Sequence, residues 1–102
     1  MSLKRSESRT QKKLRVRPLI GKEDGALIFS MSVLELEPGG HTPNHSHERE
    51  DQLFVISGNG EVKTVEGSYN IGPGTAVFFP SNEPHQVINS GSGPLMVLVV
   101  TH

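Results

Sequence analysis

The sequence predicts an all-β fold in a single domain. After Arg17, glycine and proline recur at short intervals between runs rich in Val, Ile, Leu and Phe, which is typical of strands separated by turns. No window of about 11 residues places its apolar positions at the helical repeat. The chain of 102 residues is long enough for one compact domain and too short for two. Together these observations favour a sandwich or barrel of short strands.

We expect strands wherever a run of β-favouring residues is bounded by turn residues. Prolines that cannot continue a strand pairing, among them Pro38, Pro73 and Pro94, lie between the runs. Short glycine-containing segments at 57–60 and 65–68 can reverse the chain into antiparallel neighbours. The expected strands cover residues 14–16, 26–36, 52–56, 60–65, 68–71, 75–79, 85–88 and 95–101.

The charges divide the chain into two parts. Residues 1–17 carry seven basic side chains against Glu7 alone, a net charge of +6, whereas the remaining residues have a net charge of −7. We therefore predict a basic N-terminal arm at 1–17 and a barrel domain at 18–102. The arm has no aromatic residue to stack on a base and no recognition-helix pattern, so nucleic acid is not the expected partner. A solvated tail, partly docked on the acidic body, is the preferred interpretation.

The composition narrows the location and the chemistry of the chain. No apolar run approaches the roughly 20 residues that a membrane helix needs, and the N-terminus lacks the hydrophobic stretch of a signal peptide. We expect a cytoplasmic protein without a membrane partner. The sequence contains no cysteine, so nitrogen and oxygen donors must hold any metal ion.

The segment 95–100 is apolar at every position instead of alternating with polar residues. Both faces of such a strand have to be covered, and a chain of this size covers only part of its surface by itself. A homodimer is the preferred explanation, ahead of a monomer covered by its own N-terminal segment.

Histidines and one acidic residue form the most informative pattern. His45 and His47 are two apart, so in an extended segment both imidazoles point to the same side. Asp51 has the same parity unless the charged link at 48–50 resets it. A third imidazole, that of His85, follows a turn after a strand that ends at Pro80. These residues are candidate metal ligands, whereas a loop position for His41 and a terminal position for His102 favour no such role.

Two segments resemble the signature motifs of the cupin superfamily. The first motif, G-x5-H-x-H-x3/4-E-x6-G, is matched with every spacing kept and with Asp in place of Glu. The second, G-x5-P-x-G-x2-H-x3-N, is matched with Asn in place of the inner Gly. The matching residues are Gly39, His45, His47, Asp51 and Gly58 in the first motif and Gly74, Pro80, Asn82, His85 and Asn89 in the second.

The resemblance implies a single cupin-type β-barrel, the double-stranded β-helix or jelly roll, with a divalent metal ion inside. It assigns the ligands to His45, His47, Asp51 and His85. Asn82 is a mild departure, because Asn readily adopts the positive φ expected at the family glycine. Asp51 is the larger one, because its side chain is one methylene shorter than Glu; Gln52, at the four-residue spacing, is the alternative ligand.

Such a site suits Fe, Mn, Ni, Co, Cu or Zn without choosing between them. We expect a metal-dependent enzyme of oxygenase, decarboxylase or isomerase type acting on a small oxygen-rich or acidic molecule. The alternatives are a non-catalytic module that binds a sugar or an acid, and a structural or nucleic-acid-associated role of the basic arm. Nucleophile-elbow, phosphate-loop and paired-carboxylate glycosidase patterns are missing from the sequence. Expected pocket-lining residues are Val55, Val87 and Phe79, or Phe78 in its place.

Overall fold

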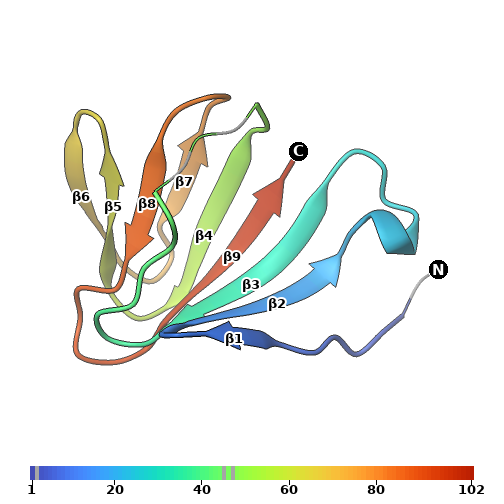
Figure 1. Cartoon of the computed structure of the whole chain (residues 1–102), viewed down its shortest axis with the longest axis horizontal. Helices are drawn as coiled ribbons and strands as arrows, with labels where there is room; N and C mark the ends of the chain where they lie inside the picture. Colours follow the sequence, from blue (N-terminus) through green and yellow to red (C-terminus); the bar gives the residue numbers. More distant parts are fainter. Residues whose placement is uncertain (2, 45, 47) are drawn as a thin grey trace.

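The computed structural model describes residues 1, 3–44, 46 and 48–102. Strands dominate this part of the chain, and one 3-10 helix, η1, interrupts them (Figure 1). The elements are β1 (Arg9–Gln11), β2 (Leu14–Ile20), η1 (Lys22–Asp24), β3 (Ser30–Leu36), β4 (Asp51–Ser57), β5 (Gly60–Thr64), β6 (Gly67–Ile71), β7 (Ala76–Phe79), β8 (His85–Ile88) and β9 (Leu95–Thr101).

The strands form two antiparallel sheets. A six-stranded sheet has the order β1-β2-β3-β9-β4-β7, and a three-stranded sheet has the order β6-β5-β8. The long sheet curves from β7 to β1, and the short sheet stands beside β7 and β4 (Figure 1). The all-β prediction is confirmed, and the strands form two sheets instead of one closed sheet.

The core lies between the two sheets. Leu36, Val55, Leu95 and Val97 are fully buried on the inner face of the long sheet, and Val62 and Val87 cover them from the short sheet. These residues alternate along their strands with more exposed neighbours, as the two-residue period of a strand requires. The alternation fixes which side chains of each strand reach the interior.

Several residues of the two motifs allow unusual backbone conformations or hydrogen-bond to the backbone. Gly39, Gly58 and Gly74 all have φ between 83° and 88°, and a Cβ atom at Gly58 would lie 2.3 Å from the Pro94 carbonyl oxygen. Asn82 has φ 64°, as its place in the turn predicts. Asn89 is 1% exposed; its amide donates to the carbonyls of Leu36 and Gly93, and its oxygen accepts from the N–H of Gly91.

The N-terminal half departs from the predicted strand pattern in three places. Residues 26–29 are not a strand: they follow η1 and the left-handed Gly25, and Leu27 and Ile28 are 85% and 77% exposed. Strand β1 was not predicted, because its residues are polar and exposed. Strand β2 continues through Pro18, which lies beyond the last residue paired with β1, where an edge tolerates proline. It thus crosses the point where the charge pattern predicts the end of the basic arm.

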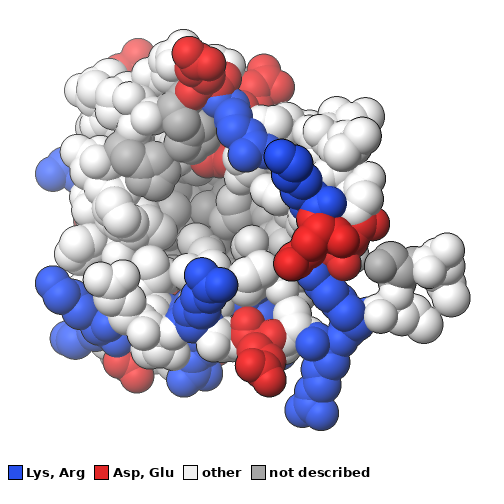
Figure 2. Space-filling model, turned by 45° about the vertical axis from the view of Figure 1, so that its right-hand side comes forward, with Lys and Arg blue, Asp and Glu red and all other residues white. Residues whose placement is uncertain are grey.

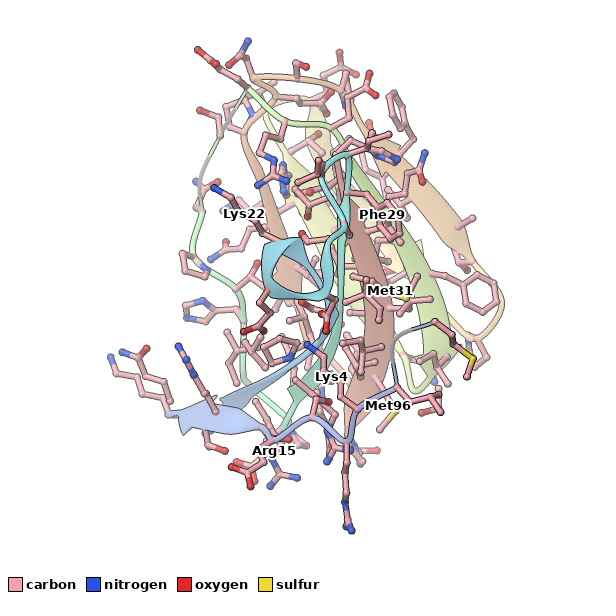
Figure 3. All side chains as sticks on the ribbon, turned by 90° about the vertical axis from the view of Figure 1, so that its right-hand side faces the viewer. Lys4, Arg15, Lys22, Phe29, Met31 and Met96 are labelled. Atoms are coloured by element: carbon pink, nitrogen blue, oxygen red, sulfur yellow. The ribbon has the colours of Figure 1, made fainter. Side chains whose placement is uncertain are left out.

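The first residues of the chain are tied to η1. Lys4 Nζ lies 2.7 Å from Asp24 Oδ2 and 3.3 Å from Glu23 Oε1, and Figure 3 shows Lys4 beside this helix. The hydrogen bond to Lys4 holds the pKa of the Asp24 carboxyl below its ordinary value, and the same bond raises the pKa of Lys4. The basic arm is therefore docked, in part, by acidic groups of the body.

The outer face of the long sheet is apolar over several strands. Phe54 and Phe78 are 45% and 53% exposed there, and Met31 and Met96 project from the same side of the sheet (Figure 3). Val33, Leu98 and Val100 lie between them by register. No helix in the described ranges is long and apolar enough to cross a membrane.

Candidate metal centre

Two predicted ligands begin strands that belong to different sheets, β4 of the long sheet and β8 of the short one. Asp51 is the first residue of β4, where it pairs with Phe79 of β7 and Thr101 of β9. His85 is the first residue of β8, after the turn that includes Pro80 and Asn82. Both side chains are buried on the inner side, with the residues 7% and 5% exposed.

The two side chains meet at short range. His85 Nε2 lies 3.3 Å from Asp51 Oδ2. Two donors bound at about 2.1 Å to one ion, at a right angle, lie about 3 Å apart. The separation of 3.3 Å between His85 Nε2 and Asp51 Oδ2 is close to this value.

Neighbouring groups fix the orientation of both candidates. The Thr101 hydroxyl donates to Asp51 Oδ1 at 2.6 Å, which leaves Oδ2 toward His85. His85 Nδ1 lies 2.9 Å from the Glu83 carbonyl oxygen; since a carbonyl only accepts, Nδ1 carries the hydrogen. Phe79 stacks on the imidazole with ring centroids 4.1 Å apart and 7° between the planes. With its hydrogen on Nδ1 held by a carbonyl, His85 directs Nε2 toward Asp51, the arrangement common in metal-binding histidines.

The pair offers one nitrogen and one oxygen atom to a proton or a cation between them. An Nε2 lone pair and a carboxylate oxygen repel at this distance unless a proton or a metal ion lies between them. Nitrogen and carboxylate donors of this kind suit first-row divalent metals. In the part of the chain that the structure describes, no group of three or more acidic or histidine side chains converges as a metal site would require.

The remaining site predictions fall in different places. His45 and His47 lie outside the described residues. Gln52 is exposed and has the opposite parity to Asp51 on β4, so its side chain is on the outer face. His41 is exposed, forms an isolated bridge with Ile88, and its Nδ1 lies 3.0 Å from the Thr42 carbonyl oxygen.

A cavity opens beside Asp51 and His85. Its volume is about 240 Å³, and Figure 2 shows the hollow on this side of the molecule, with charged side chains gathered around its rim. Phe79 and Val87 are among its lining residues, whereas Val55 is fully buried in the core. The other lining residues were not predicted from the sequence: Val16, Ser32, Leu34, Thr42, Leu53, Val99 and Thr101.

Apart from Thr42, which lies outside the strands, the unpredicted residues all have inward-facing positions on their strands. Leu53 has the parity of Asp51, and Val99 has the parity of Thr101. Pairing of Asp51 with Thr101 and of Leu53 with Val99 then brings them to one wall. The pairing register, which the sequence does not specify, was needed to find them.

Residues 32–101 match the cupin domain family model, and the chain belongs to that family. Auxin-binding protein 1 from Arabidopsis thaliana is 32% identical over 91 residues, which cover 74% of this chain and 46% of that protein. The chain thus spans about half the length of this relative.

Solved structures agree with the fold. The polyketide cyclase RemF from Streptomyces resistomycificus superposes with a TM-score of 0.87 and 29% identity, covering 98% of this chain and 79% of that one. A sugar phosphate isomerase of the cupin superfamily from Silicibacter pomeroyi gives 0.78 and 25%, covering 87% and 59%. Proteins with similar barrels therefore have different names and activities, so the fold alone does not determine the activity, and the site residues must be considered.

Proposed function

We propose that the chain binds one divalent metal ion through His45, His47, Asp51 and His85 and acts as a metal-dependent enzyme on a small acidic or oxygen-rich molecule. The observation that carries the proposal is the buried His85 Nε2 to Asp51 Oδ2 approach of 3.3 Å at the wall of a cavity. Fe, Mn, Ni, Co, Cu and Zn all suit these donors.

The bound ion would act as a Lewis acid toward substrate oxygen, in chemistry of oxygenase, decarboxylase or isomerase type. The chain's own groups have distinct parts in this proposal. Thr101 orients the Asp51 carboxylate, and the Glu83 carbonyl holds the hydrogen of His85 on Nδ1. Phe79 restricts rotation of the imidazole and keeps water from one of its faces.

Element analysis of the purified protein tests the metal site. We expect one equivalent of a divalent metal, with His85→Ala or His47→Ala lowering the occupancy sharply because each variant removes a donor. His41→Ala is the matched control and should retain the metal. Equal losses in all three variants would refute the ligand set. Removing the metal with a chelator should abolish turnover.

A non-catalytic binding module is the second candidate. The relative from Arabidopsis thaliana carries the name of a binding protein and shares 32% identity with the chain. Thermal stabilisation by a small acid with no product formed, in metal-loaded protein, would favour this function over the enzyme.

A homodimer through the outer face of the long sheet is part of the proposal. Phe54 and Phe78 are about half exposed on a face that also carries Leu98, and large exposed apolar patches commonly mark interfaces. Sedimentation should give a dimer for the natural chain and a monomer for the Phe54→Lys, Phe78→Lys double variant. A natural chain that sediments as a monomer at high concentration would contradict this.

A further inference from the structure

The cavity beside Asp51 and His85 has predominantly apolar walls. One side chain from each of the six surrounding strands β2, β3, β4, β7, β8 and β9 contributes to them: Val16, Leu34, Leu53, Phe79, Val87 and Val99. The apolar lining is therefore a property of the whole inner surface and not of one strand.

Few polar groups of the wall are free to recognise a ligand. The Thr101 hydroxyl is donated to Asp51, and the buried Thr42 hydroxyl oxygen accepts the Val87 N–H at 2.9 Å. Only the Thr42 hydroxyl hydrogen and the Ser32 hydroxyl remain, among the described lining residues, without a recorded partner. A ligand with many hydroxyl groups would leave most of them unpaired against Val and Leu, which disfavours binding.

Among the described lining residues, no basic side chain is present to bind phosphate. Asp51 and His85 are the titratable side chains of the described wall, and no lysine or arginine lines it. Phosphate recognition normally relies on Arg, Lys or a row of backbone N–H groups. The volume of about 240 Å³ lies below the usual range of about 300–1,000 Å³ for ligand pockets.

We infer that the cavity selects a small carboxylic acid or enol with an apolar ring or branched body over polyhydroxylated and phosphorylated molecules of similar size. The oxygen-bearing end of the ligand faces Asp51 and His85, and its apolar body contacts residues such as Leu34 and Val99. The inference deepens the proposed function. Only the contact of the ligand's oxygen-bearing end with Asp51 and His85 rests on the proposed metal site.

Calorimetry with matched probes tests the selectivity on the full chain, with and without Co(II). Cyclohexanecarboxylate and quinate share a ring and a carboxylate and differ by the hydroxyl groups of quinate; ribose 5-phosphate tests the phosphate class. We expect cyclohexanecarboxylate to bind at least about tenfold more tightly than either. Equal or tighter binding of quinate or ribose 5-phosphate, or no binding of any probe, would overturn the inference.

Two isosteric variants test whether the wall is the source of the preference. Val99→Thr places a hydroxyl on the cavity wall and should weaken cyclohexanecarboxylate about tenfold. Val65→Thr makes the same change at a residue that is 78% exposed in the β5–β6 turn, and it should leave binding unchanged. Unchanged binding in Val99→Thr, or the same loss in both variants, would contradict the inference.

The two proposals fail in different ways. If Co(II) does not bind, the metal-dependent function is lost, but the order of the probes in the metal-free protein still tests the apolar selectivity. If Co(II) binds with one equivalent and quinate is preferred, the metal site stands and the inferred ligand class is wrong.

Discussion

The inner and outer faces of the six-stranded sheet are both rich in apolar side chains, but they differ in burial and in the polar groups among them. On the inner face Leu95 and Val97 are fully buried, and Asp51 is held there by Thr101. On the outer face Phe54 and Phe78 remain about half exposed. The same strands thus build a core with a site on one side and a surface suited to a partner on the other.

The largest expected effect is a loss of folding stability when a buried side chain of β9 is shortened. Leu95→Ala should reduce the free energy of unfolding by about 2–5 kcal/mol, because it leaves a cavity between packed residues. Leu98→Ala, three positions along the same strand and on the outer face, should cost less than half as much. Urea unfolding at low protein concentration measures both, and equal losses would remove the distinction between the faces.

Substitutions at two adjacent residues of β4, which lie on opposite faces of the sheet, should have different effects on metal binding. Asp51→Asn should weaken metal binding by more than about 100-fold, beyond the usual effect of losing an outer hydrogen-bond partner. Gln52→Ala should leave the affinity unchanged, because Gln52 points outward. Competition with a fluorescent zinc chelator gives both affinities. A stronger effect at Gln52 would show that Gln52, and not Asp51, is the oxygen ligand.

A smaller effect is expected at the residue that orients Asp51. Thr101→Val keeps the shape of the side chain and removes the 2.6 Å hydrogen bond to Oδ1, so metal affinity should fall about tenfold. Thr101→Ser should restore it. Thr10→Val, on the exposed strand β1, is the control for a general effect of the substitution. Loss of affinity in Thr101→Ser as well would argue against a role for the hydroxyl.

The smallest effect is expected at the edge, where Lys4 meets Asp24. The lowered pKa of Asp24 means that this pair stabilises the docked segment above the ordinary Asp pKa and is lost as the pH falls through the lower folded value. Asp24→Asn should accelerate tryptic cleavage near Lys4 more than Glu23→Gln does, since Glu23 is more distant and more exposed. Identical cleavage rates in the two variants and the natural chain would exclude such docking.

The strand runs were predictable where turn residues bound an apolar segment, as at Leu95–Thr101 and His85–Ile88. The predicted strand 26–36 was wrong only at residues 26–29, because η1 and Gly25 turn the chain there, and apolar composition alone does not reveal a turn. Polar Arg9–Gln11 was missed because an edge strand gains its stability from backbone pairing rather than from burial.

The candidate site was predictable in part. Motif spacing singled out Asp51 and His85, but whether the shorter carboxylate reaches His85 depends on strand placement, which brings the two atoms within 3.3 Å. Thr101 lies 50 positions from Asp51 and carries no local signal, so only the β4–β9 register identifies it. Contacts between distant strands are a property of packing and cannot be read from either segment alone.

Anomalous diffraction from crystals loaded with Zn(II) or Co(II) tests the central claim most directly. We predict one strong peak, bonded at about 2.1 Å to both His85 Nε2 and an Asp51 carboxylate oxygen. A peak that contacts neither residue, or fully loaded crystals in which His85 and Asp51 contact only each other, would contradict a shared ion.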